Sequence, residues 1–386
     1  MYTCGPSIYL LPHIGNYRTF LYEDILNRYL DYLGYEVDRA LNVTDVEDKA
    51  IAEAEKEHTS LKKLTEKNAE IFLDELKKLG AKMPTHFPKS STSVEQAVEI
   101  IETLLKKGYA YWHGGSVYFD PLKFKDFGKL YRLDMRRWPK EKRRFYKDTY
   151  PGNRWNLGDF ILWHGYKEGD KVFWNTRLGR GRPAWNVQDP AMVSKTLGCR
   201  VDLYCGGVDN LIRHHDYVKA IMESLTGKPF AHYWLHGEHL FVDGKKMSKS
   251  RGNIIYPKDL VERGCPWQHV RFFLINGYYR KRLNFTQRKF KVVCDRLNEF
   301  KNMVNELQKV KVGTSNKRVK KLIRALKSDF EKQMNDDLHV KKAFDALFMG
   351  VSKLKDLATK GKVSPEDAKV ALSELKQIDQ VLNVIF

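Results

Sequence analysis

The first forty residues combine two apolar patterns. Apolar side chains recur every three or four positions across residues 17–33, which predicts a helix, and Gly34 directly after them is a typical helix end. Apolar stretches at residues 8–11 and 35–41 predict strands before and after that helix. A strand, a helix and a second strand in this order form a βαβ unit. We therefore expect a parallel sheet, and the ligands of such sheets gather at the carboxyl ends of the strands.

Helical patterns dominate the rest of the chain. Residues 52–82 predict a charged helical segment, and residues 93–107 predict an amphipathic helix. Residues 200–204 form a candidate buried strand, and residues 233–237 form the last strand candidate. After residue 290 the apolar positions keep helical spacing to the end of the sequence, which predicts a helix bundle.

Composition adds a charge signal to this picture. The chain has 386 residues, and its formal net charge is +20. Such charge favours a polyanionic partner, because Lys and Arg contacts to phosphates release counterions; the alternative is a basic surface that only maintains solubility. The cysteines have no tight paired spacing, which favours a reducing cytoplasm over a disulfide framework. They are Cys4, Cys199, Cys205, Cys265 and Cys294. We see no apolar run long enough for a bilayer and no export signal, so we expect no membrane partner.

Two separate stretches carry the candidate chemistry. Residues 12–16, Pro-His-Ile-Gly-Asn, precede the first predicted helix, whose N-terminal N–H groups and dipole favour a phosphate. His13 would add a donor, and Gly15 has no Cβ, so a flat ring could lie close to the backbone. Residues 246–250, Lys-Met-Ser-Lys-Ser, place ammonium groups where developing phosphate charge needs compensation.

Together and in this order, the two stretches resemble the HIGH and KMSKS signatures of class I aminoacyl-tRNA synthetases, with Asn16 in place of the last His. The strings at residues 2–9, 42–49 and 179–185 resemble cysteinyl-tRNA synthetases, and this resemblance runs to about residue 290. It implies an α/β fold: a Rossmann-like parallel-sheet nucleotide-binding domain with an insertion, followed by an α-helical bundle. The expected regions are 1–108 (first half of the Rossmann domain), 109–183 (connective insertion), 184–245 (second half), 246–290 (lysine loop and stem-contact region) and 291–386 (helical bundle).

The resemblance implies an enzyme that joins an amino acid, cysteine by resemblance, to ATP with the help of Mg²⁺ and passes it from the adenylate to tRNA. The implied catalytic residues are His13, Asn16, Lys246 and Lys249. The implied ATP-binding residues are Gly15, Gly206, Gly207, Asp209, Met247, Ser248 and Ser250. The implied amino-acid-binding residues are Cys4, Gly5, Ser7, Thr44, Trp185 and His214.

The family's zinc site is altered in this sequence. Cysteinyl-tRNA synthetases bind the cysteine thiolate through Zn²⁺ held by two Cys, one His and one Glu. The matching positions here are Cys4, Asp189, His214 and Val218, and valine cannot ligate a metal. Cys4, Asp189 and His214 thus remain as candidate ligands; both a weakened zinc site and a site without metal are compatible with them. Two neighbours could substitute, Cys205 and His215.

The predicted insertion is rich in basic and aromatic residues, which suits single-stranded RNA. We expect it to contact a tRNA acceptor end, with four arginines as candidates: Arg136, Arg137, Arg143 and Arg144. Residues 335–338 resemble the family's helical anticodon-stem region, and the family's terminal anticodon domain is expected to be absent or replaced by a partner. Two alternatives remain, a cysteine ligase acting on a small amine such as an amino-sugar and a non-catalytic RNA-binding paralogue.

Overall fold

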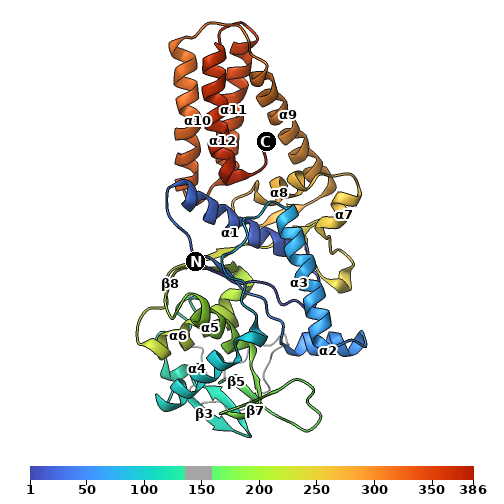
Figure 1. Cartoon of the computed structure of the whole chain (residues 1–386), viewed down its shortest axis with the longest axis vertical. Coiled ribbons are helices and arrows are strands. Elements are labelled where there is room, and N and C mark those ends of the chain that lie inside the picture. The colour runs from blue at the N-terminus through green and yellow to red at the C-terminus, as the bar shows by residue number, and fades with distance from the viewer. Residues whose placement is uncertain (135–158) are drawn as a thin grey trace. The chain divides into compact units, whose positions relative to one another are not determined.

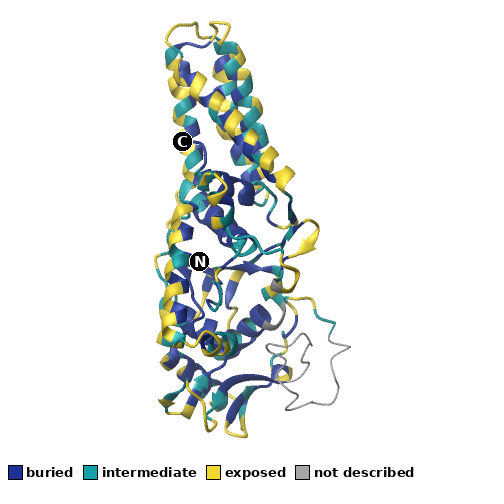
Figure 2. Cartoon of the chain, turned by 90° about the vertical axis from the view of Figure 1, so that its right-hand side faces the viewer, coloured by how far each residue is buried: buried dark blue, intermediate teal, exposed yellow. Residues whose placement is uncertain are grey.

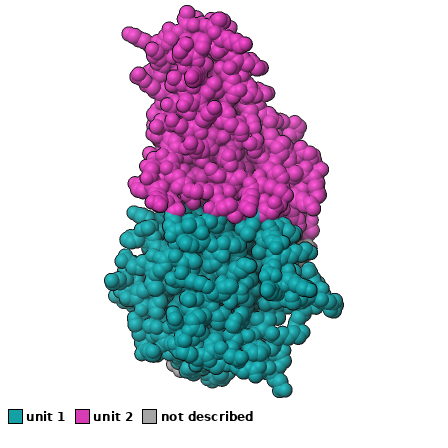
Figure 3. Space-filling view, viewed as in Figure 1, with its two compact units in different colours: residues 1–11, 38–73, 84–236 teal, residues 12–37, 74–83, 237–386 magenta. Residues whose placement is uncertain are grey.

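The computed structural model describes residues 1–134 and 159–386. The chain divides into two compact units, each assembled from three stretches of sequence, which Figure 3 colours separately. Unit 1 comprises residues 1–11, 38–73 and 84–236, and unit 2 comprises residues 12–37, 74–83 and 237–386. Each unit therefore depends on contacts between residues that are far apart in the sequence.

Unit 1 contains the predicted parallel sheet. Its strands are β1 (Tyr2–Thr3), β2 (Ala40–Leu41), β8 (Val201–Gly207) and β9 (Ala231–Gly237), in the order β2-β1-β8-β9. The central strand β1 is parallel to both neighbours, with Tyr2 opposite Ala40 on one side and Tyr204 on the other. The parallel arrangement expected from the sequence is confirmed.

Three details of the sequence prediction are wrong. The strand before the first helix is β1 and not residues 8–11, where only an isolated bridge beside Thr44 forms. The second strand is shortened to β2, because most of the residues predicted before it are exposed or half-buried. Gly206 and Gly207 are the last residues of β8 and do not follow it.

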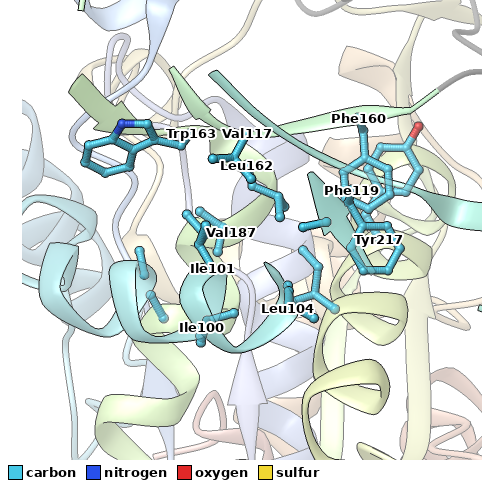
Figure 4. Packing of buried hydrophobic residues seen from close by; sticks show 14 of the residues in the cluster. Ile100, Ile101, Leu104, Val117, Phe119, Phe160, Leu162, Trp163, Val187 and Tyr217 are labelled. Atoms are coloured by element: carbon cyan, nitrogen blue, oxygen red, sulfur yellow. The ribbon is translucent and has the colours of Figure 1, made fainter. Parts of the chain in front are cut away.

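A second sheet in unit 1 is antiparallel. It contains β3 (Ala110–His113), β4 (Ser116–Phe119), β5 (Phe160–Gly165), β6 (Trp174–Thr176) and β7 (Gly179–Pro183), in the order β3-β4-β5-β7-β6. It packs in one apolar cluster with residues of α4 (Val94–Lys106), α5 (Trp185–Thr196) and α6 (Asp216–Thr226). Figure 4 shows Phe160 between Phe119 and Tyr217, with ring centroids 4.8 and 4.0 Å away. The predicted helix at residues 52–82 is two helices, α2 (Asp48–Lys56) and α3 (Leu61–Lys78).

Unit 2 joins a small sheet to a helical bundle (Figure 1). The sheet has the order β11-β10-β12, formed by β11 (Lys245–Lys246), β10 (Leu240–Val242) and β12 (Leu283–Phe285). The first helix, α1 (Ile14–Tyr32), ends before Gly34, whose φ of 88° favours glycine. Short helices α7 (Pro257–Glu262) and α8 (Trp267–Ile275) precede the bundle.

The bundle confirms the helical prediction for the last hundred residues. Its helices are α9 (Gln287–Gln308), α10 (Lys317–Asn335), α11 (Val340–Ala358) and α12 (Pro365–Leu382). Thr286, Asn316 and Ser364 cap α9, α10 and α12 through side-chain oxygens. Each helix has a buried and an exposed side (Figure 2), and its buried positions are mostly apolar. Among the described residues, none of the helices has the length and apolar character needed to span a membrane.

The β3–β4 hairpin allows a direct test of the unit 1 core. Phe119 is completely buried, whereas Trp112 on the paired strand is 47% exposed. We expect Phe119→Ala to lower the free energy of unfolding by about 3–5 kcal/mol, because it removes transfer energy and leaves a cavity. Trp112→Ala should change it by less than about 1 kcal/mol. Urea unfolding of both variants measures the difference, and equal losses would contradict this account of the core.

Candidate functional site

The end of β1 brings Cys4 and Gly5 next to the ends of its neighbours. The Cys4 N–H donates to Cys205 O on β8 at 3.0 Å, which extends the parallel pairing by one residue. The Gly5 N–H donates to Asn42 Oδ1 at 2.7 Å. A Cβ on Gly5 would lie 1.7 Å from the Asn42 carbonyl oxygen, so no other residue fits here without a backbone shift. Three polar strand ends of unit 1 therefore meet at one edge, as expected for a parallel sheet.

A buried carboxylate on α5 organises this edge. Asp189 Oδ2 accepts from the Tyr204 hydroxyl at 2.9 Å, and Oδ1 accepts from Asn42 Nδ2 at 3.2 Å. Oδ2 is also 3.0 Å from His214 Nε2. Burial and the Asp189 charge raise the pKa of Tyr204 well above its usual value, so its hydroxyl remains a donor. The carboxylate is thus held by three side chains from three different elements.

Cys4 lies in the same cluster. Its Sγ is 3.4 Å from His214 Nε2, and Asn210 Nδ2 approaches the sulfur at 3.6 Å. The ring of Trp185 stacks on His214 with centroids 4.0 Å apart. The structure therefore brings together Cys4, Asp189 and His214, which are separated by up to 210 residues in the sequence.

The neighbouring His215 joins this cluster from the other side. Its Nδ1 is 2.7 Å from His236 Nε2, while its buried Nε2 has no hydrogen-bond partner among the described residues. Burial, with His236 and His214 nearby, lowers the pKa of His215 well below its usual value, so the ring is neutral. Cys4, His214 and His215 offer ligand atoms that all lie within 4.8 Å of one another. A Cβ on Gly206 would stand 2.6 Å from the His215 ring, which explains the glycine there.

The four-ligand zinc set implied by the resemblance does not fit this chain. Val218 is fully buried in an apolar cluster with Tyr2 and Tyr204 and has no donor atom. Asp189 already accepts hydrogen bonds on both oxygens. A set of three ligands, Cys4, His214 and His215, does fit the described geometry, and the lone acceptor on His215 suits it.

The other predicted residues of unit 1 have varied surroundings. Ser7 and Thr44 form an isolated parallel bridge beside the strand ends. Asp209 is exposed in a short turn of helix at Val208–Asn210, directly after Gly207. A small cavity of about 20 Å³ is lined by Trp185 together with, among others, Glu47 and Arg182.

In unit 2, His13 is the N-cap of α1. Its Nδ1 accepts from the N–H groups of Gly15 and Asn16 at 3.1 and 3.3 Å, and Asn16 Oδ1 accepts from the His13 N–H at 3.0 Å. These hydrogen bonds assign the ring proton to Nε2. The cap therefore occupies N–H groups of the first helical turn that would otherwise be open to a phosphate. In their place, His13 presents an Nε2–H donor.

The lysine loop, residues 246–250, begins at the last residue of β11 in the same unit. Lys246 is exposed, and its carbonyl accepts from Arg251 Nη1 at 3.0 Å. Asn253 Oδ1 accepts from the Ser248 N–H at 3.0 Å, and the Ser248 and Ser250 hydroxyls are 3.3 Å apart. The hairpin and loop border a hollow of about 770 Å³.

The turn at residues 12–16, called the His13 turn below, contacts the lysine loop. A Cβ on Gly15 would lie 2.7 Å from Met247 Cε, and the Ile14 N–H donates to Ile255 O at 3.0 Å. The glycine thus admits the methionine side chain. The Lys249 side chain and the four arginines predicted to bind tRNA lie outside what the structure describes; these are Arg136, Arg137, Arg143 and Arg144.

The sequence prediction missed several partners of the site. Asn42 and Tyr204 bond Asp189, Asn210 approaches Cys4, and His236 bonds His215. Asn42 and Asp189 are 147 residues apart, so no local pattern connects them. The position of Asn42 at the end of a predicted strand was the one signal available.

Comparison with known proteins agrees with this geometry. The model of the family described as tRNA synthetases class I (C) catalytic domain matches residues 1–295. The Cysteine--tRNA ligase of Chlamydia pneumoniae is 38% identical over 394 residues, which covers 100% of this chain and 82% of that protein. The Cysteine--tRNA ligase of Brachyspira hyodysenteriae is 36% identical over 390 residues, with 100% and 81% covered.

Solved structures show the same fold at lower identity. A Mycobacterium tuberculosis methionyl-tRNA synthetase bound by methionyl-adenylate has a TM-score of 0.70 at 15% identity, covering 100% of this chain and 90% of that one. An Agrobacterium radiobacter LeuRS in a ternary complex with tRNA has a TM-score of 0.71 at 13% identity, covering 100% and 84%. The chain therefore belongs to the class I tRNA synthetase family of ATP-dependent ligases. Within that family, its relatives over the full length place it with the cysteine--tRNA ligases.

Proposed function

We propose that this chain activates cysteine with ATP and transfers it to tRNA in the cytoplasm. The observation that carries the proposal is the contact within unit 2 between the His13 turn and the lysine loop, two elements suited to one polyphosphate. A ligase for a small amine and a non-catalytic RNA-binding paralogue are not favoured, because the full-length relatives are Cysteine--tRNA ligases.

In the first step, the cysteine carboxylate attacks the α-phosphate of ATP and pyrophosphate leaves. His13 donates from Nε2 to a phosphate oxygen, and the Asn16 amide donates from Nδ2, since its Oδ1 is occupied by the helix cap. Lys246 and Lys249 stabilise the charge that develops on the leaving pyrophosphate; Mg²⁺, when bound with ATP, would supply further positive charge there. Positioning and charge compensation, and not covalent catalysis by a side chain, supply the acceleration.

The unit 1 cluster is proposed to select the amino acid. Gly5 directly follows Cys4 and bonds Asn42, Trp185 stacks on His214, and Ser7 and Thr44 pair with each other a few residues after the strand ends. Zinc, when bound, would attract a substrate thiolate more strongly than a hydroxyl, and Cys4, His214 and His215 would hold it. His215 would donate its Nδ1 proton to His236 and keep the Nε2 lone pair for the metal.

The second step needs a tRNA acceptor end. The insertion predicted at residues 109–183 would present it, and the helical region at residues 291–386 would contact the tRNA stem. The adenosine of ATP would lie against Gly206, Gly207 and Asp209, whose exposed carboxylate suits ribose hydroxyls.

The helix cap allows the catalytic role of His13 to be separated from its structural role. Asparagine is also a good N-cap, so His13→Asn should keep α1 intact but lose the Nε2–H donor. We expect a loss of about 3 kcal/mol of transition-state stabilisation, roughly a hundredfold in rate, as for other preorganised donors. ATP–pyrophosphate exchange with cysteine measures the rate, and thermal unfolding checks the cap. Full activity in His13→Asn would refute the assigned donor.

Metal analysis distinguishes the two possible third ligands. We expect His215→Asn to lose zinc, because it removes one of three ligands, and Asp189→Asn to keep it, because an asparagine still bonds Tyr204 or Asn42. Zinc content of protein purified without added metal is the measurement, with Cys4→Ser as the metal-free control. Zinc retained in His215→Asn but lost in Asp189→Asn would instead make Asp189 the ligand. With zinc bound, the rate of activation should favour cysteine over serine by more than ~10²-fold. Without zinc, the preference should fall to the ~10²-fold that the shape of a pocket alone provides.

Binding to tRNA should depend steeply on salt, because each neutralised phosphate adds ~0.7 to 0.9 to the log–log slope. Replacing the four arginines Arg136, Arg137, Arg143 and Arg144 by Ala should reduce the slope by about 3. The matched control replaces four exposed lysines of α2 and α3: Lys56, Lys62, Lys63 and Lys67. If both sets flatten the slope equally, net charge and not the insertion determines binding.

A further inference from the structure

One buried arginine of α1 has four backbone acceptors in unit 2. Arg18 is 4% exposed. Its Nη1 donates to Glu238 O and His239 O, both at 2.8 Å, and its Nη2 donates to Tyr278 O at 3.3 Å and to Lys281 O. All these hydrogen bonds end on carbonyl oxygens. The guanidinium group therefore fixes backbone positions, and its plane sets the directions of several bonds at once.

The four carbonyls lie just before two strands of one sheet. Glu238 and His239 directly precede β10, and Tyr278 and Lys281 precede β12. The two strands are parallel, with Leu240 opposite Leu283. Strand β10 also pairs with β11, where Phe241 is opposite Lys246 at the start of the lysine loop. Arg18 thus holds the starting ends of the strands that support this loop.

The same helix touches the loop region one turn before Arg18, at its N-terminus. The Ile14 N–H donates to Ile255 O, and Met247 packs against Gly15. The catalytic donor His13 caps this helix. Contacts at the first turn and at Arg18 therefore attach α1 to the lysine-loop sheet at two separate points. Two attachment points determine both the distance and the angle between His13 and the loop, which one contact cannot do.

The burial of Arg18 has an energetic cost that simple packing would avoid. Desolvation lowers the pKa of its guanidinium to about 10, which still leaves it charged at neutral pH. A buried charge needs good geometry and satisfied donors, so an apolar side chain would be the cheaper way to fill the same space. The retained charge indicates that bond direction matters at this place.

We propose that Arg18 is a positioning residue for amino-acid activation, because it sets the lysine loop relative to His13 through the four carbonyls before β10 and β12. This inference rests on the proposed function. Lysine cannot replace Arg18, since its single ammonium group cannot reach carbonyls on both strand ends with the same geometry.

The matched control is Arg271, a second fully buried arginine of unit 2. It donates to Leu382 O at 2.8 Å, to Leu79 O at 3.1 Å and to Asp24 Oδ2 at 2.7 Å, and none of these groups belongs to the lysine-loop sheet. Arg18→Lys and Arg271→Lys are therefore the same substitution at two buried sites that differ in what the guanidinium holds: Arg18 bonds carbonyls before the strands of the lysine-loop sheet, and Arg271 bonds two other carbonyls and Asp24.

Cysteine-dependent ATP–pyrophosphate exchange should show a kcat at least tenfold lower in Arg18→Lys, with KM for ATP and cysteine within about twofold, since the loop acts mainly in the transition state. Arg271→Lys should lower Tm but keep kcat.

Limited trypsin digestion gives a readout that does not depend on activity. Cleavage at the exposed Lys245, Lys246 and Arg251 should become faster in Arg18→Lys only. Methylguanidinium should restore part of kcat in Arg18→Ala.

Unchanged kcat in Arg18→Lys, or equal losses in both variants, would overturn the proposal. An Arg18→Lys chain that does not fold, while Arg271→Lys folds, would assign Arg18 to stability and overturn it as well. Absence of exchange in the unmutated chain would refute the proposed function instead, and the trypsin comparison would still test the position of the loop.

Discussion

The pairing of β1 with two parallel neighbours is the constraint on which the unit 1 site depends. This strand is two residues long, yet its backbone bonds both β2 and β8. Cys4 and Gly5 follow it immediately, so the same ladder places the Cys4 backbone beside Cys205 and the glycine against Asn42. A Cβ on Gly5 would lie only 1.7 Å from the Asn42 carbonyl oxygen, which shows how closely the strand ends approach each other. The position of this short strand therefore determines where Cys4 meets His214 and where Gly5 meets Asn42.

Around that edge, hydrogen bonds stabilise a buried carboxylate. Asp189 accepts from Tyr204 and Asn42, and its Oδ2 lies 3.0 Å from His214 Nε2. A buried carboxylate without such donors would be costly, so these bonds are a condition for its burial. His215, oriented by His236, has a buried Nε2 without a hydrogen-bond partner among the described residues. The site therefore combines a carboxylate that is hydrogen-bonded on both oxygens with an imidazole nitrogen that is not.

In unit 2, the chemistry depends on orientation and not on the presence of basic residues alone. The capping box turns the His13 ring so that Nε2 carries the proton, and Gly15 admits Met247 of the lysine loop. Arg18 connects the same helix to the strands behind the loop. These contacts are all within one unit, and they connect the His13 donor to Met247 of the loop and to the strands that support it. That is the preorganisation on which electrostatic stabilisation of a transition state relies.

The sequence by itself determined the elements and chemistry that depend on neighbouring residues. Helical spacing predicted α1, α4 and the bundle, Gly34 predicted a helix end, and two short motifs identified the family, because each signal is confined to a few turns. Only the tertiary structure decided how short the strands are, that Asp189 bonds Asn42 and Tyr204, and that His215 faces Cys4. Those outcomes depend on side chains as far apart in the sequence as Cys4 and His215. Burial and bond geometry between distant segments are properties of the packed chain, and no local pattern encodes them.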